Sequence, residues 1–151
     1  MLRDEIARSR TFSDRPLPFE PEQGRKEPPY HFTNDLVRRL PDWSRSLLVG
    51  RCDYVRLKPR QMLQERNLPL RYAYFPEHGA ASLTATAGNC LPVEIQTVGA
   101  KDFIGIPLIL GMRVSPHRCM VQVPGKALRI EADALIELKS RNYSCGTFRL
   151  P

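Results

Sequence analysis

Turn-forming residues interrupt this sequence about every 8 to 12 residues between Cys52 and Ile130, a spacing that leaves no room there for long helices. Between the interruptions the apolar period is close to 2, which is typical of β-strands. We predict strands at residues 52–57, 61–64, 72–75, 81–87, 93–98, 118–123 and 127–130. The predicted breaks include Glu77-His78-Gly79 and Pro124-Gly125. This regular spacing favours an antiparallel barrel, roll or sandwich over alternating βαβ units.

Helices are expected on either side of the strands. Two short ones are predicted over 34–40 and 42–50, where Pro41 separates them and Asp42 suits the N-cap of the second. The apolar face of the second helix is expected to hold Trp43, Leu47 and Leu48. A further short helix is predicted after Gly105, and a last one over 131–141.

A chain of 151 residues is long enough for one domain with a proper core. Residues 1–29 hold five prolines and balanced charge, so we expect a disordered or loosely docked N-terminal arm. Residues 30–141 are predicted to form the β domain with its flanking helices, and 142–151 a C-terminal tail without a helix-turn-helix. No apolar stretch approaches the roughly 20 residues of a membrane span, and the charged N-terminus does not resemble a signal peptide. We therefore expect a cytoplasmic protein without a membrane segment.

Charge and cysteine content restrict the partners and cofactors. The 23 basic and 16 acidic residues give a net charge of +7, which attracts phosphate-rich partners but does not identify one. The four cysteines lie far apart without a CxxC pair, so the spacing predicts reduced structural thiols and no metal site.

Several short motifs occur in an order that resembles a known family. They are Tyr74-Phe75-Pro76-x-x-Gly79, Asp102-Phe103-Ile104-Gly105, Leu110-Gly111 and Val121-Gln122-Val123-Pro124-Gly125. Over about residues 31–140 this order resembles the sensor half of the Crp/Fnr family of bacterial transcription regulators. The resemblance implies a mainly β fold with flanking helices, namely a cyclic-nucleotide-binding-like β-roll of the double-stranded β-helix or jelly-roll type.

The resemblance also implies where a ligand would bind. In nucleotide-binding members, backbone N–H groups at the short helix after the Asp-Phe-x-Gly turn bind the cyclic phosphate. A Glu directly after the Gly binds the ribose hydroxyl, and an Arg in an Arg-x-small pattern pairs with the phosphate. The matching ligand-binding residues of this chain are Gly105, Ile106, Pro107, Leu108, His117, Arg118 and Cys119.

Three of these positions depart from the family pattern. Ile106 stands where the Glu should be, His117 stands where the Arg should be, and Pro107 lacks an N–H. Losing a charge-assisted acceptor should cost roughly 1.5–3 kcal/mol at that contact. The apolar residues Ile106, Leu108, Ile109 and Leu110 are expected to fill the pocket or pack in the core, and Cys119 to be a small core residue.

The sequence therefore predicts a regulatory sensor domain with a degenerate cyclic-nucleotide pocket, no enzymatic activity, no catalytic residues and no cofactor. The alternative is a genuine cyclic AMP or cyclic GMP binding module, in which Arg118 reaches the phosphate if the loop shifts by one residue. A metal enzyme of the cupin type would need a close His and Glu cluster, which the sequence lacks. Expected partners are a small-molecule effector, another protein, or a second copy bound through the C-terminal helix. Direct DNA binding is not expected, because only about ten residues follow the last predicted helix.

Overall fold

Two long strands form the middle of the sheet. In the computed structural model, which describes residues 31–144, β3 (Tyr72–Ala85) and β5 (Arg118–Glu131) pair antiparallel along their whole length. Strand β1 (Cys52–Leu57) pairs with the C-terminal part of β5, and β2 (Met62–Gln64) with its N-terminal part. Strand β4 (Val93–Val98) pairs with β3, so the order is β1-β5-β3-β4 with β2 beside β5. The predicted mainly β fold with flanking helices is confirmed.

The prediction of chain breaks at Glu77-His78-Gly79 and Pro124-Gly125 is wrong, because both strands continue through these residues. The pairing register shifts around His78 and Ala80, so the ladder bends at β-bulges there. A Cβ on Gly125 would lie 1.9 Å from the carbonyl oxygen of His78. The glycine thus serves the close approach of two bent strands rather than a reversal of the chain.

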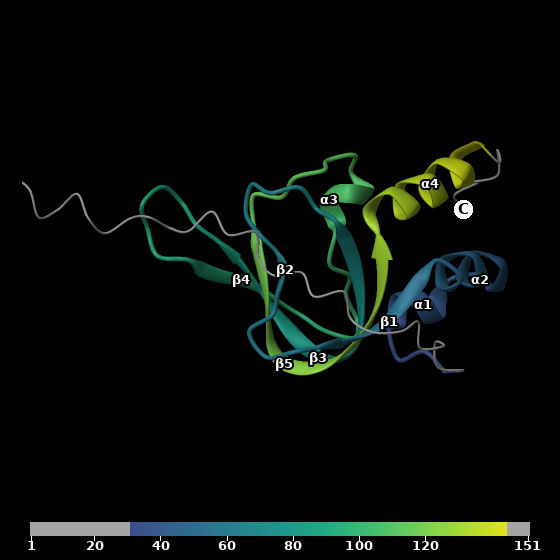
Figure 1. Ribbon diagram of the computed structural model, residues 1–151, viewed down its shortest axis with the longest axis horizontal. Helices are drawn as coiled ribbons and strands as arrows, with labels where there is room; N and C mark the ends of the chain where they lie inside the picture. The colour runs from purple at the N-terminus through teal and green to yellow at the C-terminus, as the bar shows by residue number, and fades with distance from the viewer. Residues whose placement is uncertain (1–30, 145–151) are drawn as a thin grey trace, which may run out of the picture.

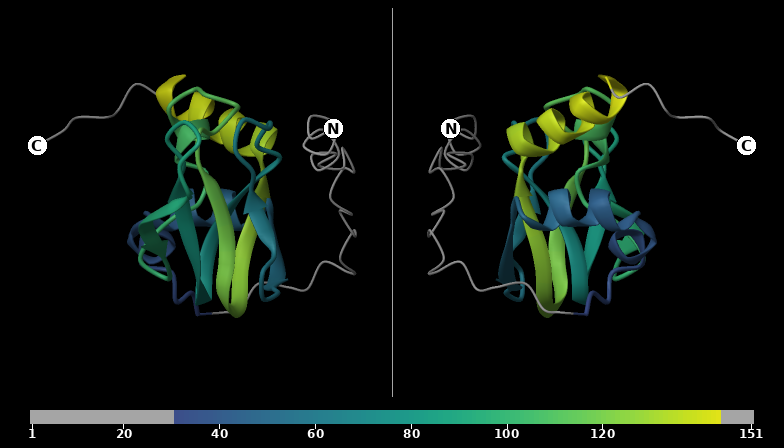
Figure 2. Two further views of the ribbon diagram at one scale, coloured as in Figure 1. Left: turned by 90° about the vertical axis from the view of Figure 1, so that its left-hand side faces the viewer. Right: turned by 90° about the vertical axis from the view of Figure 1, so that its right-hand side faces the viewer.

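Helices α1 (Asp35–Arg39), α2 (Asp42–Val49) and α4 (Ala132–Ser144) gather on one side of the roll, on the right in Figure 1. The hairpin of β3 and β4 reaches out on the opposite side, and Figure 2 shows α4 across one end of the strands. Helix α4 continues three residues beyond the predicted end at 141.

Helix α2 differs from the prediction in its cap and its buried face. Pro41 is the N-cap, while Asp42 is the first helical residue and forms an ion pair with Arg45. Trp43 and Leu47 are exposed, and of the predicted apolar face only Leu48 is buried. Two turns of helix lying against the roll bury a narrow stripe of side chains, so apolar spacing alone overestimates the buried face.

A single buried amide joins α1 to the sheet. The Oδ1 atom of Asn34 accepts hydrogen bonds from the N–H groups of Leu36 (3.1 Å) and Val37 (3.2 Å) and so caps α1. Its Nδ2 atom donates to the carbonyl oxygens of Pro76 (2.8 Å) and Asp102 (3.0 Å). Three segments far apart in the sequence therefore meet at one side chain.

The core has two clusters, and the β3–β5 ladder that both contact has two ends. At the helix end, Tyr72–Pro76 pairs with Ala127–Glu131, and at the site end, Ala80–Thr84 pairs with Arg118–Val123. The first cluster lies between the helix end and the helices; its buried members are Val37, Leu48, Leu70, Ala73, Phe75, Leu108, Leu128, Ile130, Ala132 and Leu135. The second fills the roll between the strands; its members are Val55, Leu57, Leu63, Tyr74, Ala81, Val98, Ile104, Cys119, Val121 and Ala127.

The predicted N-terminal arm, residues 1–29, lies outside the described residues, as do residues 145–151 of the predicted tail. Among the helices that the structure describes, none has the length and apolar character that crossing a bilayer requires.

Candidate functional site

The short helix predicted after Gly105 is present as α3 (Ile106–Ile109). Gly105 precedes it with φ of 122°, and a Cβ at this position would lie 2.8 Å from the Cβ of Ala73. Glycine is therefore required both by the backbone conformation and by the close approach of β3.

The N-terminus of α3 offers few hydrogen-bond donors. Pro107 has no N–H, and the N–H of Leu108 already donates to the carbonyl oxygen of Gly105 at 3.0 Å. Among the first three residues of α3, Ile106 alone therefore keeps an N–H that bonds to no described residue. This start of a helix can offer an anion one of the donors that a helix N-terminus ordinarily provides.

The prediction that the apolar side chains around α3 fill the pocket or the core is correct for Leu108, which is buried, and wrong for the other three. Ile106 is 52% exposed and Leu110 is 68% exposed, and Ile109 is also exposed. A helix of one turn on the surface of the roll buries a single side, so its remaining side chains face solvent. Ile106, at the position of the family's Glu, thus presents an apolar surface and accepts no hydrogen bond through its side chain.

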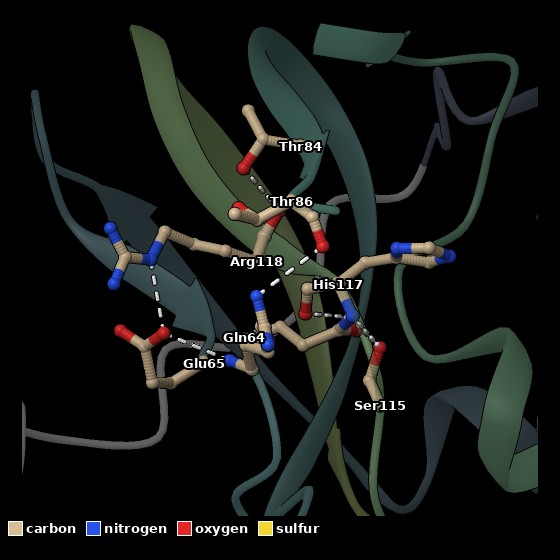
Figure 3. A network of polar contacts seen from close by, with 8 residues as sticks. Gln64, Glu65, Thr84, Thr86, Ser115, His117 and Arg118 are labelled. Carbon is tan, nitrogen blue, oxygen red and sulfur yellow. Dashed lines mark hydrogen bonds and ion pairs between the residues drawn. The ribbon is translucent and has the colours of Figure 1, made fainter. Parts of the chain in front are cut away.

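The loop before β5 is held by a buried glutamine (Figure 3). The Nε2 atom of Gln64 donates to the hydroxyl oxygen of Ser115 and to the carbonyl oxygen of His117, the latter at 2.9 Å. The N–H of His117 donates to the same hydroxyl oxygen at 3.1 Å. Both Gln64 and Ser115 are buried. This network fixes the backbone at the position of the family's Arg, and the Nδ1 atom of His117 is buried without a partner among the described residues.

Sequence reasoning did not name Gln64 or Ser115 as site residues. The signal was weak, since one polar residue in a three-residue strand is ordinary for an exposed edge. The pairing of Gln64 with Cys119 across β2 and β5 reveals its buried position.

Arg118 lies on the opposite side of β5 from Cys119. Cys119 is fully buried, as predicted, and burial raises the pKa of its thiol to about 12. The side chain of Arg118 is 42% exposed, and its Nε atom donates to Oε1 of Glu65 at 3.0 Å. Figure 3 shows the Arg118 and His117 side chains pointing in opposite directions. The structure therefore does not bring the guanidinium of Arg118 to the side of β5 that His117 faces.

Arg118 instead lines a cavity of about 250 Å³ on the outer face of the sheet, which we call the outer-face pocket. Its lining residues are Glu65, Arg66, Asn67, Thr84, Thr86, Pro92 and Arg118. They come from the segment after β2, the end of β3, the segment before β4 and the start of β5. Helix α3 contributes no residue to this pocket, and among the lining residues sequence reasoning had named Arg118 alone as ligand-binding.

Within residues 31–144, no three His, Cys, Asp or Glu side chains lie close enough together to hold a metal ion.

Comparisons with known proteins show what this geometry resembles. No family model matches the chain, and no curated protein matches it in sequence. A cyclic nucleotide-binding domain from Methylobacillus flagellatus matches with a TM-score of 0.63 and 17% identity, over 76% of this chain and 67% of that one. The catabolite activator protein of Thermus thermophilus matches with a TM-score of 0.61 and 12% identity, over 72% and 51%.

The c-di-GMP responsive global regulator CLP of Xanthomonas campestris matches with a TM-score of 0.57 and 14% identity, over 70% of this chain and 51% of its own. The match therefore spans about half of the Thermus and Xanthomonas chains. The chain has the fold of the cyclic-nucleotide-binding β-roll, which confirms the fold implied by the resemblance to the sensor half of Crp/Fnr regulators.

Proposed function

We propose that this chain is a non-catalytic regulatory sensor domain whose cyclic-nucleotide pocket is degenerate. The observation that carries the proposal is the start of α3. Pro107 lacks an N–H there, and the N–H of Leu108 already donates to the carbonyl oxygen of Gly105. A cyclic phosphate bound there would meet one backbone donor from the first three residues of the helix, so the main source of phosphate affinity in this fold is reduced.

Two side chains support the same conclusion. Ile106 is exposed where the family has a ribose-binding Glu, and it supplies no acceptor. Arg118 pairs with Glu65 on the outer face of the sheet, so it does not replace the missing phosphate-binding Arg. In this proposal the partner is a small effector of different chemistry or another protein, reached in the cytoplasm, and dimerisation through α4 stays a prediction.

The test is a thermal-shift titration of the full chain with cyclic AMP, cyclic GMP and c-di-GMP to millimolar concentration, since a ligand that binds only the folded state raises its stability. We expect no saturable shift for the unmodified chain. A variant carrying Ile106→Glu and Pro107→Leu restores one acceptor and one donor, and we expect it to give a saturable shift with cyclic AMP over the same concentration range.

A saturable shift of the unmodified chain with cyclic AMP or cyclic GMP would overturn the proposal. If the shift also disappeared in Arg118→Ala, the domain would be a genuine cyclic-nucleotide module in which Arg118 reaches the phosphate.

A further inference from the structure

The outer-face pocket brings together two guanidinium groups that are 52 positions apart in the sequence, Arg66 and Arg118. Glu65 is the one acidic residue in the lining, so the formal charge of the lining is +1. An arginine pair in one concave site, incompletely balanced by carboxylate, is typical of a site for an oxyanion.

The carboxylate of Glu65 would repel a bound anion, but it also orients the two arginines that would bind that anion. Its Oε1 atom accepts from Nε of Arg118 at 3.0 Å and from the backbone N–H of Arg66 at 2.9 Å. The Nη groups of Arg118 bond to no other described residue, and one Nη of Arg66 makes a long contact of 3.4 Å with the carbonyl oxygen of Thr86. The donors that suit bidentate binding of an oxyanion are thus largely unused.

The walls of the pocket are fixed before any ligand arrives. Asn67 has φ of 59°, and its N–H donates to the carbonyl oxygen of Ser115 at 2.8 Å. The Thr84 hydroxyl donates to the carbonyl oxygen of Arg118 at 3.5 Å across the paired strands. A preformed site loses less entropy on binding, so a few contacts suffice for a small ligand.

We propose that the outer-face pocket binds a small phosphate-bearing anion. A volume of about 250 Å³ lies below the roughly 300–1,000 Å³ of sites for drug-sized ligands, so it suits phosphate or a small phosphate monoester rather than a whole nucleotide. This site goes beyond the proposed degenerate pocket, because it lies on the outer face of the sheet and contains no residue of α3.

The test is calorimetric titration of the full chain with inorganic phosphate at constant ionic strength, with chloride as the replaced anion. We expect saturable binding that weakens about tenfold in Arg66→Gln and in Arg118→Gln, since each removes a charge-assisted donor. The matched control is Arg38→Gln, another exposed arginine in an ion pair, at 3.4 Å from Asp35 and outside the pocket. Binding to this control should equal that of the unmodified chain.

The variant Glu65→Gln distinguishes a ligand site from a purely structural ion pair. It removes the negative charge that repels the anion, so we expect phosphate binding to become severalfold tighter. If Arg118→Gln impairs folding, Arg66→Gln carries the test, because its described contact is one long hydrogen bond to a carbonyl group. Absence of saturable binding, or equal weakening in Arg38→Gln, would overturn the proposal. Binding of a cyclic nucleotide at the start of α3 would respond to changes at Ile106 and Pro107 and not to Arg66→Gln, so the two proposals can fail independently.

Discussion

The two ends of the β3–β5 ladder differ in how many of their faces are covered. At the helix end both faces of β5 are covered. Leu128 and Ile130 are buried against the helices, and Ala127 is buried inside the roll. At the site end, Cys119 and Val121 are buried while Arg118 and Gln122 lie on the outer face. The helix end thus uses both faces of its strands for stability, and the site end leaves one face for polar chemistry.

The largest expected effect comes from a substitution at the point where the two ends of the ladder meet. We expect Gly125→Ala to lower the free energy of unfolding by more than about 3 kcal/mol, because its Cβ would collide with the backbone of His78 and force the strands apart. Urea unfolding followed by circular dichroism measures this loss. Gly88→Ala is the control, since its Cβ would meet nothing within 4 Å and its φ of 56° should cost only about 1 kcal/mol. Equal losses would show that the close approach is unimportant.

Two buried amides, one at each end, provide a finer comparison. Asn34→Ala removes a helix cap and two buried hydrogen bonds at the helix end, and we expect a loss of about 2–4 kcal/mol. Gln64→Ala removes the bonds to Ser115 and His117 at the site end, with an expected loss of about 1–3 kcal/mol. The same urea experiment measures both, and Gln96→Ala on an exposed strand serves as the reference. A larger loss for Gln64→Ala would reverse the assignment of stability to the helix end.

Thiol reactivity gives the smallest and most local comparison. Burial raises the pKa of Cys52, which lies at the helix end, and of Cys119 at the site end from 9.0 to about 12, while Cys90 is exposed. Because the thiolate is the nucleophile, at pH 8 the thiolate fraction of these two thiols is about a thousandfold below that of an ordinary thiol of pKa 9. Alkylation followed by peptide mass spectrometry should therefore modify Cys90 long before either of them. Early modification of Cys119 without Cys52 would show that the site end opens on its own.

The strand bounds could be predicted from the sequence where turn-forming residues really end a strand. Strands β1 and β4 have the predicted bounds, because turns flank both of them. The long strands were divided into two each, because the residues that usually reverse a chain here bend a continuous ladder, at His78 and Gly125. Whether such a residue bends a strand or ends it depends on pairing with a strand about 50 positions away, which a local sequence pattern does not show.

The candidate site was predictable only in part. The departures at Ile106, Pro107 and His117 were visible as residue types, and the position of Gly105 before a short helix is confirmed. The direction of the Arg118 side chain depends on which residues of β5 face the roll. The outer-face pocket also needs Arg66 and Thr86, which follow β2 and β3 and come together because both strands pair with β5.

The strand order also has a consequence for how the chain acquires its structure. Strand β5 is the last strand among residues 31–144, yet it pairs with β1, β2 and β3. Until β5 has been synthesised, the hairpin of β3 and β4 is the one described strand pairing that can form. The sheet therefore closes late and through contacts of long sequence separation, which makes folding slow compared with that of a helical protein of similar length. A nascent chain that stops before Arg118 would expose the apolar residues of β1 and β3 to any chaperone or aggregating neighbour that meets it first.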